Sequence, residues 1–357
     1  MSITEQTLAP AGKPSSAQVA AIIAGRRARH RRHATATIVL SILLLALFAT
    51  ALMVGNTFYS LDEVVRVIVG QTVPGASFTV GELRLPRAVL AVLTGLAFGI
   101  AGVSFQTLLR NPLASPDIIG ISNGASAAAV IGIVVLSLNG PAVSVFALGG
   151  ALVTAGAIYL LSIKSGFAGT RLILIGIGVA AMLQSVVSYV LSRAAAWDIQ
   201  TAMQWIAGSL NNASWERVAP MAIAAVVIVP LMFAQGRALG AMQLGDDSAS
   251  GLGVRVNRTR LLFMLGAVAL LAFATAATGP IAFVAFMAGP IAARITGPGA
   301  NLLAPSALVG AVLVLGADLI AQFAFGARYP VGVVTGVLGA PYLIYLLIRT
   351  NRSGGSL

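Results

Sequence analysis

The chain consists mainly of long apolar runs separated by short polar segments that hold most of the charged residues. A bilayer core of roughly 30 Å needs about 20 helical residues to cross it, and nearly charge-free runs of about that length recur along the sequence. The ten predicted spans cover residues 35–55, 87–109, 118–138, 141–163, 172–192, 218–235, 261–279, 280–293, 303–323 and 331–348. This pattern predicts an all-α polytopic membrane protein with ten transmembrane helices.

The run 261–293 is the ambiguous part of this count, because it is long for one span and short for two. Gly279-Pro280 and Gly289-Pro290 interrupt it. A single span would place Arg349 and Arg352 on the side opposite the basic N-terminal segment, against the positive-inside tendency. Two spans are therefore preferred, and the N- and C-termini are then both cytoplasmic.

The same pattern divides the chain into three parts. Residues 1–33 are polar and lack the apolar core of a cleavable secretory signal, which predicts a disordered basic cytoplasmic tail. Residues 34–350 form the ten-span transmembrane domain. Residues 351–357 form a short cytoplasmic tail.

Composition excludes a soluble protein with one membrane anchor. Of the 357 residues, 58% are hydrophobic and 9% are charged, whereas soluble domains carry roughly 25% charged residues. The net charge is +12, yet its densest cluster directly precedes the first span, as expected for a segment at the anionic cytoplasmic face of a membrane rather than for a nucleic-acid site. That cluster consists of Arg26, Arg27, Arg29, Arg31 and Arg32.

Two loops are predicted to carry short surface helices. Ser60 and Glu63 form a capping box before an apolar segment. All three tryptophans lie in the loop between the fifth and sixth spans, which predicts an amphipathic helix at the membrane interface. They are Trp197, Trp205 and Trp215.

Several chemistries lack the residues that they need. The two histidines, His30 and His33, lie in the tail, and the chain has no cysteine, so no metal ligand set, haem ligand or cofactor is predicted. The chain also lacks a phosphate-binding loop of the type G-x-x-x-x-G-K-[ST]. We therefore predict that it is not an enzyme and that any ATP hydrolysis takes place on another subunit.

Glycines spaced by four residues are assigned to helix packing. Gly120 and Gly124 match the nucleophile motif G-x-S-x-G, but the match opens a membrane span and has no histidine base, so close helix contact is the preferred interpretation. Gly95 with Gly99 and Gly332 with Gly336 have the same spacing.

Asp318 is the one acid well inside a predicted span. An unpaired buried carboxylate can act as a proton site of a secondary transporter. The alternative, which we prefer, is a neutral or hydrogen-bonded carboxyl group with a structural role.

Three stretches resemble one known family. They are Leu83–Arg87 followed by Arg110–Ala125, Leu244–Val254 (LGDDSASGLGV), and Tyr329–Pro341 (YPVGVVTGVLGAP). In this order they resemble the FecCD permease family, which supplies the membrane subunits of ABC importers for iron-siderophore complexes, haem and cobalamin. The resemblance runs from about Leu40 to Arg349.

The resemblance implies a type II ABC importer in the cytoplasmic (inner) membrane of a bacterium. Its other parts would be a second permease subunit, two ABC ATPase subunits and an extracytoplasmic substrate-binding protein. The transported ligand would be a ferric siderophore, and the motifs look closest to permeases of catecholate systems. Haem or cobalamin import by the same family, a proton-coupled secondary transporter that uses Asp318, and a structural subunit whose paralogue lines the path are the alternatives.

The resemblance also assigns roles to particular residues. Acids favour a helix N-terminus and Gly253 is placed to end a helix, so the loop around Asp246 and Asp247 is predicted to form a short capped helix. The resemblance implies that this is the coupling helix that contacts the ATPase. An ordinary capped loop is the alternative. The coupling residues are Leu244, Gly245, Asp246, Asp247, Ala249, Leu252 and Gly253.

Docking and translocation residues follow from the same comparison. Arg84, Arg87 and Arg328 would bind acidic residues of the substrate-binding protein, with snorkelling at the interface as the alternative. Relatives often have Glu-Leu-Pro where this chain has Arg328-Tyr-Pro. The fifth span would line the path with a stripe at three- and four-residue spacing, which helix packing could also explain. The stripe consists of Met182, Ser185, Ser188 and Tyr189.

Overall fold

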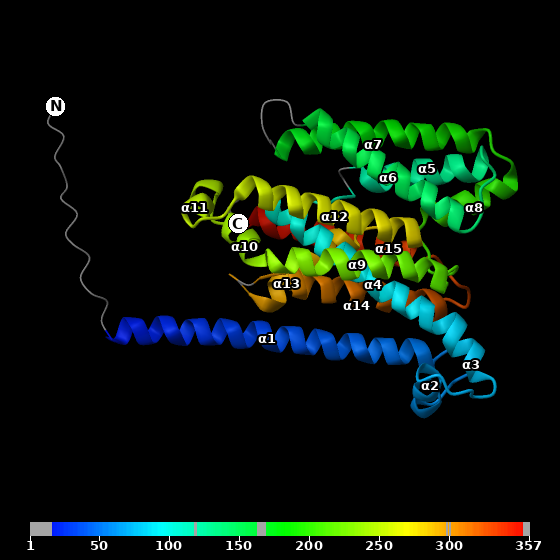
Figure 1. Cartoon of the computed structure of the whole chain (residues 1–357), viewed down its shortest axis with the longest axis horizontal. Helices are drawn as coiled ribbons and strands as arrows, with labels where there is room; N and C mark the ends of the chain where they lie inside the picture. Colours follow the sequence, from blue (N-terminus) through cyan, green and yellow to red (C-terminus); the bar gives the residue numbers. More distant parts are fainter. Residues whose placement is uncertain (1–15, 118–119, 163–168, 298, 300, 353–357) are drawn as a thin grey trace.

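The computed structural model describes residues 16–117, 120–162, 169–297, 299 and 301–352. Every regular element in these ranges is helical. The long helices lie side by side and run along the length of the molecule (Figure 1). The predicted all-α fold is therefore confirmed.

Within the described residues, eight helices are long and apolar enough to cross a membrane, and two apolar helices are shorter. The eight are α1 (Ser16–Met53), α4 (Leu85–Leu108), α6 (Pro141–Ser162), α7 (Gly169–Ser192), α9 (Trp215–Ala234), α12 (Val256–Thr278), α14 (Leu303–Phe323) and α15 (Val331–Arg352). The shorter two are α5 (Ile121–Val134) and α13 (Val284–Thr296). Each of these ten helices coincides with one predicted span.

Short elements connect the long helices at both ends of the bundle. They are α2 (Leu61–Ile68), α3 (Ala76–Phe78), the π-helical turn η1 (Thr79–Arg84), α8 (Ala196–Ile206), α10 (Gly236–Met242) and α11 (Asp246–Gly251). We call one end the α8 end, where α2, α3 and α8 lie, and the other the α11 end, where α10, α11, the start of α1 and the end of α15 lie (Figure 1).

The ambiguous run 261–293 forms two helices, as preferred from the sequence. α12 ends at Thr278, and α13 begins at Val284. Between them the backbone takes positive φ angles at Gly279 (74°) and Phe283 (64°), which a continuous right-handed helix does not contain.

The predicted disordered tail is wrong over residues 16–33, because α1 begins at Ser16. Residues 1–15 of the predicted tail, and 353–357 of the C-terminal tail, lie outside the described residues. The segment 16–33 is rich in alanine and arginine, which are among the strongest helix formers. Extending the helix through this segment therefore costs little free energy, whereas polarity alone predicted an irregular tail.

The core of the bundle is α4, whose small residues let its neighbours approach closely. A Cβ atom on Gly95 would lie 2.5 Å from the Cα of Ala311 in α14, and one on Gly99 would overlap the carbonyl oxygen of Ser306. Glycine at these positions lets the two backbones touch, as in close membrane helix pairs. The predicted packing role of Gly95 and Gly99 is confirmed.

The other glycine pairs differ from one another. Gly124 packs against Thr154 and Gly150 of α6, which confirms its packing role. Gly120 caps α5 with a φ angle of 92°. Gly332 touches the carbonyl oxygen of Ala207, but a Cβ atom on Gly336 would meet no described atom within 4 Å. The predicted packing role therefore holds for Gly332 alone in that pair.

Both predicted surface helices are present. The backbone N–H of Ser60 donates to Glu63 Oε2 (2.7 Å), and the N–H of Glu63 donates to Ser60 Oγ (3.3 Å), which completes the capping box of α2. The hydrogen bond from the Ser60 backbone is the main cause that lowers the pKa of Glu63. Helix α8 carries Trp197 and Trp205.

Candidate functional sites at the two ends of the bundle

A buried ion pair joins α4 to α14 at the α8 end. Arg87 Nε donates to Asp318 Oδ2 (2.9 Å), and Arg87 Nη2 donates to Asp318 Oδ1 (2.8 Å). The two side chains are 13% and 2% exposed. This bidentate geometry uses the planar fork of the guanidinium group and is the strongest form of such a pair.

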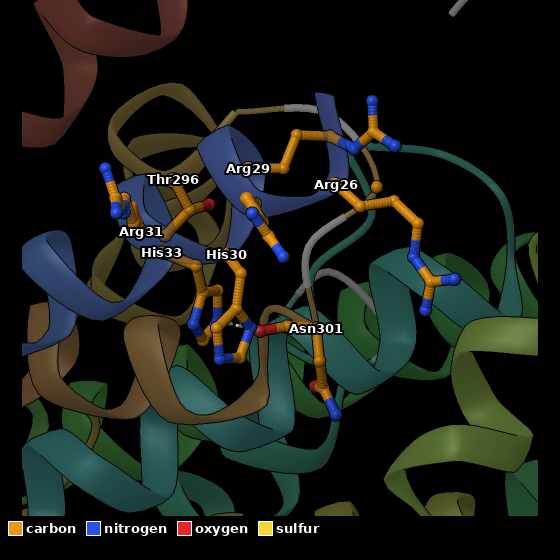
Figure 2. A pocket seen from close by; sticks show the side chains of 9 residues that line it. Arg26, Arg29, His30, Arg31, His33, Thr296 and Asn301 are labelled. Carbon is orange, nitrogen blue, oxygen red and sulfur yellow. Dashed lines mark hydrogen bonds between the residues drawn. The ribbon is translucent and has the colours of Figure 1, made fainter. Parts of the chain in front are cut away.

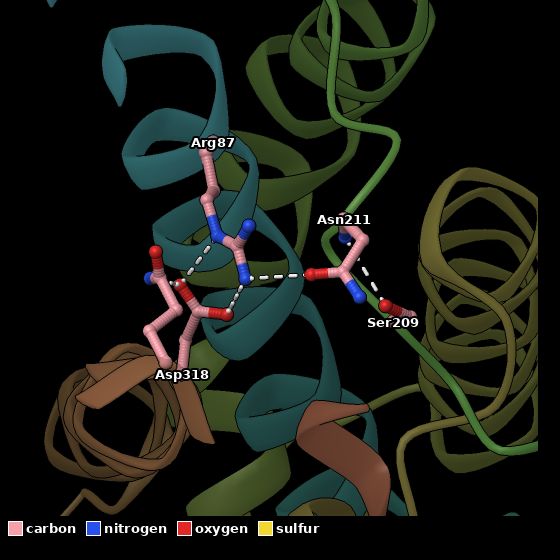
Figure 3. Close-up of polar contacts among 5 residues, drawn as sticks. Arg87, Ser209, Asn211 and Asp318 are labelled. Atoms are coloured by element: carbon pink, nitrogen blue, oxygen red, sulfur yellow. Dashed lines mark hydrogen bonds and ion pairs between the residues drawn. The ribbon is translucent and has the colours of Figure 1, made fainter. Parts of the chain in front are cut away.

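Two amides complete the network around this pair. Arg87 Nη2 also donates to Asn211 Oδ1 (3.0 Å), from the loop between α8 and α9, and Gln322 Nε2 donates to Asp318 Oδ2 (2.8 Å). Figure 3 shows the carboxylate of Asp318 on one side of the Arg87 guanidinium group and Asn211 on the other side of that group. Asp318 is therefore a paired, hydrogen-bonded carboxylate, which favours the structural interpretation over an unpaired proton site.

Arg84 closes the C-terminal end of α1. Its Nη1 donates to the carbonyl oxygens of Leu52 (2.8 Å) and Met53 (2.9 Å), and its Nη2 donates to that of Thr57 (2.6 Å). The guanidinium group also lies 5.0 Å from the ring centre of Tyr59. A cation at a helix C-terminus satisfies carbonyl groups that otherwise lack partners. Arg84 thus has a capping role within the chain.

Arg328 differs from the other two arginines that were predicted to dock a partner. Its side chain is exposed, and it forms no hydrogen bond or ion pair with the residues that the structure describes. It borders two hollows of about 290 and 220 Å³, which also contain Arg87 and Asn211 respectively. Of the three predicted docking residues, Arg328 is the one whose charge is available to a partner without breaking a contact.

The predicted coupling segment forms the short helix α11 at the other end. Gly245 (φ 109°) precedes the helix, and Gly253 (φ 83°) follows it. The N–H of Gly253 donates to the carbonyl of Ser250 (2.9 Å), and that of Val254 to the carbonyl of Ala249 (3.0 Å). This is a Schellman motif, in which glycine is favoured at the left-handed position. The predicted end of the helix at Gly253 is confirmed.

Asp246 fixes α11 to the rest of the bundle. Its Oδ1 accepts a hydrogen bond from Arg110 Nη2 (2.5 Å), just after α4, and its Oδ2 accepts one from Arg260 Nη2 (2.7 Å) in α12. One carboxylate therefore links three elements.

The remaining surface of α11 is open and partly apolar. Leu244 and Leu252 are 68% and 67% exposed, whereas Ala249 is fully buried. Asp247 is exposed beside them. Two exposed leucines and an acid next to a rigidly capped helix make a compact surface that a groove on a partner could bury.

Asp117 is a second carboxylate near the α11 end, in the connection between α4 and α5. Burial raises the pKa of its carboxyl group, and hydrogen bonds from the hydroxyl groups of Ser122 (2.7 Å) and Ser115 (3.4 Å) act in the opposite direction. Residues 118 and 119 of the same motif lie outside the described residues. Asp117 therefore closes a turn at the start of α5.

The predicted translocation stripe lies on one open face of α7. Met182, Ser185, Ser188 and Tyr189 are all exposed, and their spacing of three and four residues places them on one side of the helix. The Ser185 hydroxyl donates to the carbonyl of Ala181 (3.0 Å). Within the described residues this face packs against no other helix, so it is free to face a second subunit or a pathway. Its role in translocation stays a prediction.

Comparison with known proteins gives a consistent result. The sequence model of the FecCD transport family matches residues 42–349. The ferric enterobactin transport system permease protein FepG of Escherichia coli is 41% identical over 82% of this chain and 88% of its own length. The achromobactin transport system permease protein CbrC of Dickeya dadantii is 38% identical over 87% and 90%. The cobalamin import system permease protein BtuC of Halobacterium salinarum is 34% identical over 76% and 74%.

The fold also has a counterpart among solved structures. A metal-chelate type ABC transporter in an inward-facing conformation superposes with a TM-score of 0.78 and covers 88% of this chain and 98% of its own. The two sequences are 23% identical. The arrangement of helices described above is therefore the fold of that transporter chain.

Proposed function

This chain belongs to the FecCD transport family, and on that premise we propose that it carries a ferric siderophore of the catecholate type through a type II ABC importer. The observation that carries the proposal is the 41% identity to the ferric enterobactin permease over most of both chains. The 38% identity to an achromobactin permease supports a siderophore more broadly.

We further propose that the ten apolar helices all cross the cytoplasmic membrane. The start of α1 and the last turn of α15 lie at the same end of the bundle (Figure 1), which supports an even number of crossings. The arginine-rich part of α1 lies at that end, so the positive-inside tendency makes the α11 end cytoplasmic. The α8 end then faces the substrate-binding protein.

The importer would contain a second permease subunit, two ABC ATPase subunits and an extracytoplasmic binding protein. The chain has no phosphate-binding loop, so energy would come from the ATPase subunits through α11. Asp318, the acid on which a proton-coupled mechanism would depend, is held by Arg87. No observation on this chain favours the secondary-transporter alternative.

Uptake by proteoliposomes tests the substrate. We expect vesicles that contain this chain, its partner permease, the ATPase and the binding protein to accumulate ferric enterobactin when ATP is supplied. Cobalamin, haem and a ferric hydroxamate serve as matched competitors. Accumulation of cobalamin or haem in place of the catecholate, by a complex that hydrolyses ATP, would overturn the substrate while leaving the family intact.

Arg328 should govern docking of the binding protein. Reversing its charge with Arg328→Glu is expected to weaken the affinity of the permease for the binding protein about tenfold, because charges at the rim of an interface act through electrostatic attraction. Thermal unfolding of the permease should not change, since the side chain is exposed. Biolayer interferometry against the binding protein measures the effect at two salt concentrations. An affinity that is unchanged at low salt would exclude Arg328 from the interface.

Helix α11 should bind the ATPase through its exposed leucines. Leu252→Glu is expected to lower ATPase affinity roughly 10- to 100-fold, since burying one leucine contributes about 1.5–3 kcal/mol. Phe58→Glu is the matched control, because Phe58 is 66% exposed but precedes α2 at the opposite end. Co-purification of the ATPase with each variant measures the effect. Equal losses for both variants would show that α11 is not the contact.

A further inference from the structure

The N-terminal part of α1 extends past the membrane. The helix has 38 residues, so it is about 57 Å long at 1.5 Å per residue, whereas a bilayer core takes roughly 30 Å. We call its first eighteen residues, 16–33, the α1 arm. At the α11 end this arm must lie in the headgroup region or beyond it.

The α1 arm is held against the C-terminal end of α13. Arg32 donates from Nε to the carbonyl of Ile295 (3.0 Å) and from Nη2 to that of Arg294 (2.8 Å). His33 Nε2 lies 3.0 Å from the carbonyl oxygen of Asn301. Gly297 leaves room for this contact, because a Cβ atom there would lie 3.0 Å from Arg32 Nη1. The arm therefore has a defined position.

Between the α1 arm and the α13–α14 connection lies a hollow of about 820 Å³ (Figure 2). Cationic and imidazole side chains dominate its lining, and no carboxylate contributes to it. The lining residues are Arg26, Arg27, Arg29, His30, Arg31, His33, Thr296, Gly299 and Asn301. We call this the basic hollow.

The charges of the basic hollow are uncompensated within the described part of the chain. The ion pairs found among the described residues lie elsewhere in the molecule and involve Arg66, Arg87, Arg110 and Arg260. The four arginines of the hollow have no such partner among the described residues. Clustered like charges repel one another, so a bound anion would lower the electrostatic free energy of this arrangement.

Asn301 lies at the wall of the hollow, where its Oδ1 atom accepts a hydrogen bond from the N–H of Leu303 (3.1 Å) and its Nδ2 atom lies beside Gly236 of α10. The donors of the hollow that carry charge are therefore the guanidinium groups. Planar guanidinium groups bind phosphate oxygens through paired N–H donors. The chemistry therefore fits a phosphate group.

The next part of α1 indicates where that phosphate comes from. Directly after the arm, the exposed side chains of the same helix become apolar, as at Ile38, Val39, Ile42 and Leu45. An anionic lipid whose acyl chains lie along the apolar surface of α1 would have its headgroup at the level of the arginines of the basic hollow. We propose that the basic hollow binds the phosphate headgroup of an anionic phospholipid. The site is independent of the transported ligand.

Native mass spectrometry of the full chain with phosphatidylglycerol or phosphatidylcholine tests the proposal. The triple variant Arg26→Gln, Arg29→Gln, Arg31→Gln is expected to bind phosphatidylglycerol about 100-fold more weakly, because it removes three charge-assisted contacts to the headgroup phosphate. The control removes the same charge from exposed arginines outside the hollow. It is Arg237→Gln, Arg255→Gln, Arg258→Gln, and it should retain the affinity.

Equal losses in both triple variants would overturn the site, because they would reduce it to general attraction between a basic surface and an anionic lipid. Competition by millimolar inorganic phosphate with no preference for phosphatidylglycerol over phosphatidylcholine would also overturn it, in favour of a soluble anion.

A variant that keeps every charge gives a second test. Gly297→Ala should lower phosphatidylglycerol affinity by displacing Arg32 and the arm, whereas Gly253→Ala, with a similar φ angle but no atom within 4 Å of its Cβ, should not. Equal affinities for the two variants would show that the position of the arm is irrelevant to binding.

Discussion

Replacing Arg87 by methionine is expected to lower the free energy of unfolding by about 3–5 kcal/mol and to abolish uptake. The substitution removes the partner of Asp318, whose side chain is 2% exposed, and leaves a carboxylate buried without its cation. An uncompensated buried charge of this kind is much more costly than the loss of the pair itself. Denaturant titration of the purified permease measures the unfolding free energy.

Two controls isolate the cause. Arg328→Met makes the same substitution at the same end of the bundle, but the side chain of Arg328 is exposed. The change in the free energy of unfolding should therefore stay within about 0.5 kcal/mol. The double variant Arg87→Met, Asp318→Leu removes both charges and should recover most of the lost stability, because apolar replacements of a buried pair are often neutral. A loss below about 1 kcal/mol for Arg87→Met alone would contradict the buried pair.

This result bears on how docking mutants are interpreted. Arg87→Glu would place two carboxylates side by side, and Arg84→Glu would remove the cap of α1. Either change would reduce uptake through misfolding even if neither residue contacted a binding protein. A docking experiment is therefore informative at Arg328 and ambiguous at Arg84 and Arg87 unless folding is measured in parallel.

The Arg87–Asp318 ion pair could have been predicted from the sequence. Asp318 is the one acid well inside a predicted span, and Arg87 opens another span. Alternating span directions place both at the same end of the bundle. A charge at that depth requires a partner, so the pair follows from topology. Asn211 and Gln322 do not follow in the same way, because amides carry no charge that would demand a partner.

The α11 end shows the opposite limit. The C-terminal cap of α11 follows from local sequence, because Gly253 takes the left-handed backbone conformation directly after the helix. The ion pairs of Asp246 join it to Arg110 and Arg260, 136 and 14 residues away. Many arginines are predicted on the cytoplasmic side, and nothing in their spacing selects these two.

The α1 arm was misread for a physical reason. Disorder was predicted from polarity, but an alanine- and arginine-rich segment continues an existing helix at little cost, since the helix nucleus has already formed in the span. The contacts of Arg32 with α13 then hold it in place. For residues 16–33, the helix propensity of a segment next to a transmembrane helix predicts the structure better than its polar composition does.

Gly102→Ala is expected to destabilise the bundle by about 3 kcal/mol, the upper end of overpacking costs. The added Cβ would overlap the carbonyl oxygen of Ala285 in α13 and lie 2.7 Å from its carbonyl carbon. Both atoms belong to a backbone, so no side-chain rotation relieves the overlap and α4 must separate from α13. Thermal unfolding in detergent, followed by intrinsic tryptophan fluorescence, measures the loss.

Gly149→Ala makes the same chemical change in α6, where a Cβ atom would meet no described atom within 4 Å. There the gain in helix propensity, about 1 kcal/mol, should act alone, so this variant should be as stable as the parent or slightly more stable. The sign of the difference between the two variants thus depends on backbone contact alone. If Gly102→Ala is as stable as Gly149→Ala, α4 and α13 do not touch at this point, and the close packing around α4 is incorrect.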